Sequence, residues 1–171
     1  ETHLLGMTVA SARQHVDNHT FISHNVARCE SNEMFKYVLN DQSVGAFAGK
    51  VLVKENCPRT VAYQGNRNIV ASADAKMYSK PQLEIYTDDV KCSHGSATGQ
   101  LNEEALFYMR SRGISEAEAR QLLMQAFMSD VIDAVRLPAL KDRLHHLVEK
   151  RFRGQLAMCA DCTAANCAAA K

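Results

Sequence analysis

The sequence lacks a long apolar run, a secretion signal and an excess of charge of either sign. No stretch reaches the roughly 18 consecutive apolar residues that cross a membrane, and the first residues form neither the basic start nor the apolar segment of a signal peptide. The 20 Lys and Arg residues nearly balance the 19 Asp and Glu residues, whereas nucleic-acid-binding proteins usually carry a clustered basic excess. These absences predict a cytoplasmic protein that binds neither a membrane nor a nucleic acid.

The common sequence motifs of enzymes are also missing. The sequence contains no phosphate-binding loop, no nucleophile elbow and no dinucleotide-binding fingerprint. Its 46% apolar and 23% charged residues are nevertheless typical of a folded globular protein. We therefore expect a folded, non-catalytic protein.

Six cysteines are the most distinctive chemical feature of the 171 residues. Without a secretion signal they are expected to be reduced thiols rather than a disulfide framework. They are Cys29, Cys57, Cys92, Cys159, Cys162 and Cys167.

Short β-branched runs separated by turn residues fill residues 15–98. They are residues 44–47, 50–54, 60–64, 68–72, 82–87 and 90–94. Their spacing suggests a coil of about 17 or 18 residues with two strands, in which Val44 corresponds to Val61 and Val51 to Ile69. An antiparallel sandwich predicts the same strands, but the two-residue Asn-Gly and Asp-Gly turns that its hairpins favour do not occur. The pattern favours a parallel β-helix.

The C-terminal part of the chain has the signals of three helices. Asn102 is expected to cap the first helix, which ends before Gly113. Ser115 and Glu118 form a capping box that opens the second helix, and Pro138 stands where a third can begin. These signals predict a small α-helical subdomain after the β-helix.

Cys92 and His94 are the best candidates for chemistry in the first half. On an extended strand they would project to the same face, about 6 to 7 Å apart. A thiolate and an imidazole at that separation could both reach one metal ion or one cluster. The same spacing also suits a buried cysteine that packs as a small hydrophobe beside a hydrogen-bonded histidine.

Three further cysteines stand close to the C-terminus, at Cys159, Cys162 and Cys167. A Cys-x2-Cys turn lets two sulfurs converge on one metal ion, although no fourth ligand is evident here. Two interpretations therefore stay open for this Ala-rich segment, a mobile thiol tail and a zinc or cluster site.

One segment carries a specific resemblance to a known family. It reads KPQLEIYTDDVKCSHGSATGQLNEEALFYMRSRGI and spans residues 80–114, with supporting matches at 15–20, 35–39 and 49–53. It closely resembles the C-terminal part of SufD, a family of components of the SUF iron–sulfur cluster assembly machinery. The related SufB proteins look similar in fold but differ in sequence around this cysteine. Because the chain starts at Glu1, the resemblance implies that it is the C-terminal portion of a longer protein.

The resemblance implies a fold, partners and a site. The implied fold is mainly β. It is a right-handed parallel β-helix, here a truncated solenoid, followed by the helical subdomain. SufD proteins pair with SufB through the C-terminal part of the β-helix and dock the ATPase SufC through their helices. Cys92 and His94 match the family positions of the cluster assembly site at the SufB interface. The implied function is a scaffold of the SufBCD complex that contributes to iron acquisition and nascent cluster formation, with iron or a cluster bound only transiently in the complex and no cofactor bound tightly in isolation.

These inferences divide the chain into a β-helix core at 1–99, a helical subdomain at 100–157 and a Cys/Ala-rich tail at 158–171. An uncovered first coil is a template for strand pairing, so we also expect the isolated chain to form a homodimer or to cover that end itself. Two alternative functions stay open. One is a purely structural partner without ligands, and the other is a metal or cluster carrier that uses the terminal cysteines.

Overall fold

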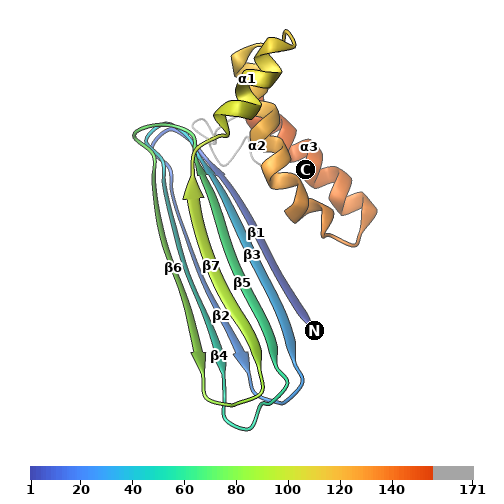
Figure 1. Ribbon diagram of the computed structural model, residues 1–171. Coiled ribbons are helices and arrows are strands. Elements are labelled where there is room, and N and C mark those ends of the chain that lie inside the picture. The colour runs from blue at the N-terminus through green and yellow to red at the C-terminus, as the bar shows by residue number, and fades with distance from the viewer. Residues whose placement is uncertain (156–171) are drawn as a thin grey trace, which may run out of the picture.

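The computed structural model describes residues 1–155, in which seven strands are followed by three helices (Figure 1). The strands are β1 (Thr2–Ala10), β2 (His15–His24), β3 (Glu30–Leu39), β4 (Val44–Val53), β5 (Val61–Val70), β6 (Lys76–Ile85) and β7 (Lys91–Gly99). The helices are α1 (Glu103–Ser111), α2 (Glu116–Asp133) and α3 (Pro138–Phe152). Among the described residues, no helix is both long and apolar enough to span a membrane.

The strands form two parallel sheets that face each other in a solenoid (Figure 1). One sheet has the order β1-β3-β5-β7 and the other the order β2-β4-β6. Successive strands alternate between the sheets, so that one coil contains two strands and each coil stacks on the previous one. The predicted parallel β-helix with a helical C-terminal part is confirmed.

The predicted length of the coil is wrong. Val44 lies in β4 and Val61 in β5, which belong to different sheets, and the same holds for Val51 and Ile69. One coil takes about 31 residues, the step from Glu30 to its partner Val61. The runs 44–47 and 50–54 belong to one continuous strand, β4, and the runs 60–64 and 68–72 to another, β5, whereas 82–87 and 90–94 fall mainly on two separate strands, β6 and β7.

Small and polar residues in the middle of the strands explain this error. Ala48 and Gly49 interrupt the β-branched pattern of β4, and Gly65 and Asn66 interrupt that of β5, although both strands are 10 residues long. The neighbouring coils supply the backbone hydrogen bonds whatever the side chain is. Glycine within a strand is typical of places where other groups approach the backbone closely.

Gly49 marks a tightly packed part of the solenoid interior. A Cβ atom at this position would lie 2.5 Å from Nε2 of Gln64 and 2.6 Å from Cζ of Phe47. We expect Gly49→Ala to lower the free energy of unfolding by about 1.5 kcal/mol, because an extra carbon in a filled core forces its neighbours to move. Gly95→Ala is the control, since nothing lies within 4 Å of a Cβ at Gly95. Equal urea midpoints for the two variants would contradict this account.

The helix ends agree with the sequence signals. The side chain of Asn102 accepts a hydrogen bond from a backbone N–H in the first turn of α1, at 3.0 Å. The hydroxyl of Ser115 accepts one from the N–H of Glu118, at 3.3 Å. Gly113 follows the end of α1 with a φ of +87°, and Pro138 is the first residue of α3. The capping rules thus located all three helices because they depend on local sequence alone.

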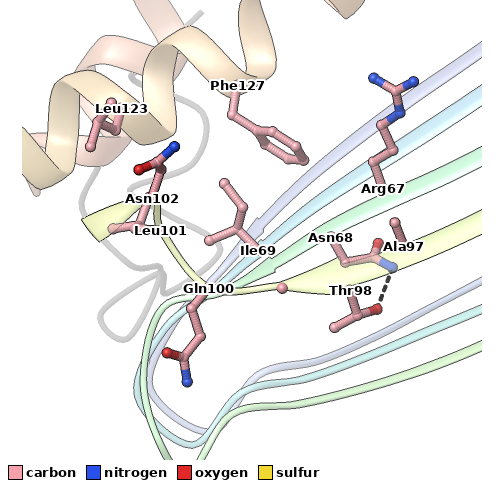
Figure 2. Close-up of a pocket in the computed structure, with 11 residues that line it drawn as sticks. Arg67, Asn68, Ile69, Ala97, Thr98, Gln100, Leu101, Asn102, Leu123 and Phe127 are labelled. Carbon is pink, nitrogen blue, oxygen red and sulfur yellow. Dashed lines mark hydrogen bonds between the residues drawn. The ribbon is translucent and has the colours of Figure 1, made fainter. Parts of the chain in front are cut away.

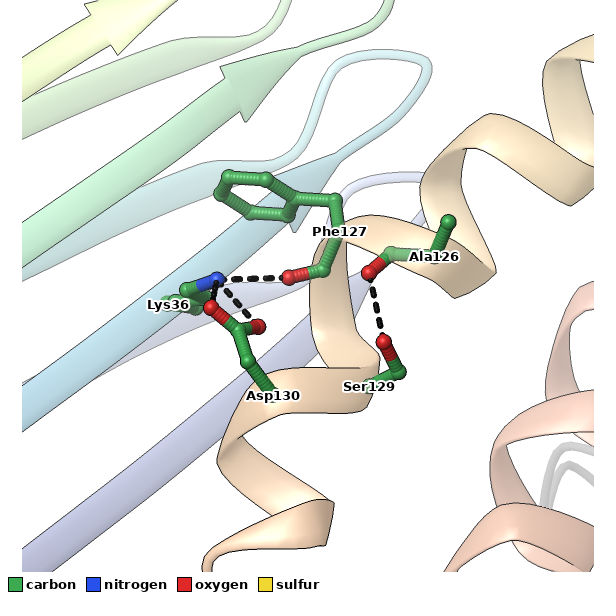
Figure 3. Close-up of polar contacts among 5 residues, drawn as sticks. All are labelled: Lys36, Ala126, Phe127, Ser129 and Asp130. Atoms are coloured by element: carbon green, nitrogen blue, oxygen red, sulfur yellow. Dashed lines mark hydrogen bonds and ion pairs between the residues drawn. The ribbon is translucent and has the colours of Figure 1, made fainter.

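Helix α2 packs on the outer face of the β1-β3-β5-β7 sheet. Val38 and Ile69 of that sheet form one apolar cluster with Leu101, Met124 and Met128. A polar contact lies beside this cluster, where the buried ammonium of Lys36 binds the carboxylate of Asp130 and donates to the carbonyl of Phe127 at 2.7 Å (Figure 3). The same ammonium lies 4.5 Å from the centre of the Phe127 ring.

Candidate metal site

The last coil of the solenoid presents two edge strands. Within residues 1–155, β7 ends one sheet and β6 ends the other, so each has a strand neighbour on one side only. The outer edge of such a strand carries backbone N–H and C=O groups that can pair with another chain. The outer edges of β6 and β7 therefore form a surface suited to strand-to-strand contact.

Cys92 and His94 lie on the same face of β7, the face that looks into the solenoid. Cys92 is in register with Ala62 and His94 with Gln64, and both of these β5 residues are buried. Because residues in register on parallel strands point to the same side of a sheet, Cys92 and His94 continue the interior-facing rows of β5. Cys92 is partly buried, and His94, on the outermost coil, is exposed.

Burial raises the pKa of the Cys92 thiol, and a hydrogen bond with the backbone of Ala62 offsets this only in part. In this chain alone the environment thus favours the neutral thiol. The thiolate that a metal requires would form on metal binding itself, which displaces the proton.

We therefore expect Cys92 to react slowly with iodoacetamide at neutral pH. The raised pKa of the thiol means that less thiolate is present at a given pH than in an unfolded chain, so the alkylation rate should reach its midpoint at a higher pH. Peptide mass spectrometry over a pH series measures the rate for Cys92 alone, with the urea-unfolded chain as control. A midpoint below that of the unfolded chain would contradict the burial argument.

Within residues 1–155, no third cysteine, histidine or acidic residue joins this pair in a group that could hold a metal ion. Cys57 is buried and Cys29 partly buried, and both are free thiols. In the part of the chain that the structure describes, no group of three or more His, Cys, Asp or Glu residues could hold a metal ion. The predicted ligands Cys159, Cys162 and Cys167 lie outside the described residues. Cys92 and His94 could therefore supply two ligands of a metal site, and further ligands would have to come from elsewhere.

The interior next to Cys92 and His94 is polar, a feature that was not predicted from the sequence. Oδ1 of Asn66 accepts hydrogen bonds from Asn68 and Ser79 at 2.7 Å each. Nε2 of Gln64 donates to the carboxylate of Glu33 at 2.8 Å. A hollow of about 390 Å³ has Glu33, Gln64 and His94 among its lining residues. The alternation of polar residues at 64, 66 and 68 of β5 was the available signal.

A second hollow lies where the solenoid meets the helices (Figure 2). It has a volume of about 420 Å³ and is mainly apolar, with Ile69 from β5 and Leu123 and Phe127 from α2 in its wall. Asn68 donates a hydrogen bond to the hydroxyl of Thr98 at 3.0 Å on one side of it. The described residues of its wall include no cysteine or histidine.

Comparisons with known proteins agree on one family. Residues 1–127 match the family model described as SUF system FeS cluster assembly, SufBD core domain. An iron–sulfur cluster assembly SufBD family protein of Synechocystis is 38% identical over 88% of this chain and 33% of its own length. The iron–sulfur cluster assembly protein SufD of Escherichia coli is 36% identical over 81% of this chain and 33% of its own length. The chain thus spans about a third of the length of these relatives.

Proposed function

The chain belongs to the SufBD core family of the SUF iron–sulfur cluster assembly system, and from this premise we propose that it is a non-catalytic scaffold of a cluster assembly complex. Family membership supports a role in iron–sulfur cluster assembly. The observation that carries the proposal is the placement of Cys92 and His94 side by side on the interior face of an edge strand.

In this proposal the edges of β6 and β7 pair with a SufB subunit. The free backbone groups of the two edge strands provide the contact, and the partner extends the solenoid by further strands. The partly buried thiol of Cys92 and the exposed imidazole of His94 then lie in the seam between the two proteins. SufB supplies the ligands that this chain lacks, and iron or a nascent cluster is held there transiently as cargo.

The helices are proposed to dock the ATPase SufC. Several large apolar side chains on the helices or between them are exposed, which is typical of a surface that meets another protein. They are Phe107, Tyr108, Leu122, Leu137, Leu140 and Leu147. Contacts that differ between the nucleotide states of SufC would shift the helices, and the Lys36–Asp130 contact would pass the shift to the solenoid.

Coexpression with SufB and SufC tests the proposal. We expect this chain to copurify with both proteins, and the complex to carry iron and sulfide after anaerobic reconstitution. If the complex of the double variant Cys92→Ala, His94→Ala forms with normal iron and sulfide contents, only a purely structural role remains for this chain. Cluster uptake by the chain alone that is lost on replacing Cys159, Cys162 and Cys167 would favour a carrier instead.

A further inference from the structure

Four buried side-chain oxygens in the solenoid have no hydrogen-bond partner among the described residues. They are Thr20 Oγ1, Glu33 Oε1, Gln64 Oε1 and Asn68 Oδ1. The side chain of Glu33 is completely buried, and Gln64 is 4% exposed. Buried polar atoms in folded proteins nearly always have a partner, so a group of unpaired acceptors in one region calls for a ligand that can satisfy them.

Gln64 links two of the other residues in the interior, because its amide nitrogen lies close to both Thr20 and Glu33. Thr20 of β2 is in register with Gly49 of β4, and its hydroxyl lies 2.9 Å from the position that a Cβ of Gly49 would take. Nε2 of Gln64 lies 2.5 Å from the same position, and it also donates to Oε2 of Glu33 at 2.8 Å. Glycine at 49 leaves the space into which the side chains of Thr20 and Gln64 reach, and Glu33 of β3 is joined to them through its hydrogen bond with Gln64.

The chemistry of this group points to a cation. The Glu33 carboxylate has one neutral amide donor and no ion pair in the described part of the chain, and a buried carboxylate is costly unless a positive charge or several donors compensate it. The free oxygens belong to a carboxylate, a primary amide and a hydroxyl. Such oxygen donors suit hard divalent cations, whereas soft metals and clusters prefer thiolate and imidazole.

We propose that Glu33, Gln64 and Thr20 form a binding site for one hard divalent cation inside the solenoid. The site is separate from Cys92 and His94 in both residues and chemistry. His94 on β7 is nonetheless in register with Gln64 on the neighbouring strand β5. The cation site therefore lies one coil further into the solenoid than the edge site formed by Cys92 and His94. It would neutralise Glu33 and stabilise the coils that carry the edge site.

Manganese(II) is a suitable probe, because free Mn²⁺ is counted by its electron paramagnetic resonance signal. We expect the chelator-treated chain to bind one Mn²⁺ and to melt at a higher temperature when the ion is present. Glu33→Gln keeps the shape of the side chain and removes its charge, and should weaken binding by about a hundredfold. Glu55→Gln, at an exposed turn residue, is the matched control and should bind as the wild type does.

A second variant keeps the test decisive if Glu33→Gln does not fold. In Thr20→Val the side chain keeps nearly the shape of threonine but lacks the hydroxyl. This variant should weaken Mn²⁺ binding by about tenfold. Absence of Mn²⁺ binding by the wild type, or unchanged affinity in the variant that folds, would overturn the inference. Binding lost in His94→Ala and kept in Glu33→Gln would also overturn it while leaving the proposed function intact. Conversely, failure to copurify with SufB would not affect the interior site.

Discussion

Replacing His94 with alanine is expected to lower, by about tenfold, the iron that copurifies with the proposed complex of this chain with SufB and SufC. Even the loss of a residue that only supports a metal ligand typically lowers metal affinity by about tenfold or more. His94 is exposed on the edge strand β7 and in register with Gln64, so truncation removes a ligand without opening a cavity in the core. The complex should therefore still assemble. Iron and acid-labile sulfide, quantified per complex after anaerobic reconstitution, measure the effect.

Two further variants make this result interpretable. Cys92→Ser removes the thiolate at the same face of β7 and should reduce iron and sulfide to a similar extent. His19→Ala removes an exposed histidine of β2 and should leave both contents unchanged. If the complexes of both His94→Ala and Cys92→Ser contain as much iron and sulfide as the wild type, these two residues of the chain contribute no ligand to the metal site.

Replacing Asp130 with alanine is expected to destabilise the protein by about 3 kcal/mol, since a buried ammonium would lose its counter-charge. Lys36 is only 3% exposed, and apart from Asp130 its ammonium contacts the carbonyl and the ring of Phe127. Those two contacts cannot replace a carboxylate. Equilibrium denaturation in urea at neutral pH gives the free energy of unfolding.

Lys36→Met is the matched control for this contact. Methionine keeps most of the apolar stem of lysine, and Asp130, whose side chain is 63% exposed, can be solvated by water. We expect a loss of about 1 kcal/mol or less, because replacing a buried charge by an apolar group of similar volume is often nearly neutral. Equal losses of unfolding free energy in Asp130→Ala and Lys36→Met would indicate that the attraction between the two charges, rather than the cost of an uncompensated buried ammonium, determines the effect.

The helices could be predicted from sequence because their ends depend on neighbouring residues. The Asn102 cap and the Ser115–Glu118 capping box each lie within four positions of the chain. The coil length could not be obtained in this way, since it depends on which strand stacks on which. Gly49 looked like the end of a strand, whereas in the structure it is paired with Thr20 and Pro81 in mid-strand.

The same distinction applies to the two candidate sites. Cys92 and His94 are two residues apart, so the assumption of an extended strand is enough to place them on one face. Thr20, Glu33 and Gln64 come from three strands in different coils or sheets. Only the register of those strands brings their side chains together, and no motif in the sequence marks them as a group.

Hydrogen exchange of the chain with and without SufB can show whether β6 and β7 pair with SufB, because it reports on the edge strands themselves. We expect slower exchange of backbone amides in β6 and β7 when SufB is bound, with little change in β1 and β2 at the opposite end of the solenoid. Protection confined to β1 and β2 or to the helices, with β7 unchanged, would contradict the placement of Cys92 and His94 at the seam between the two proteins.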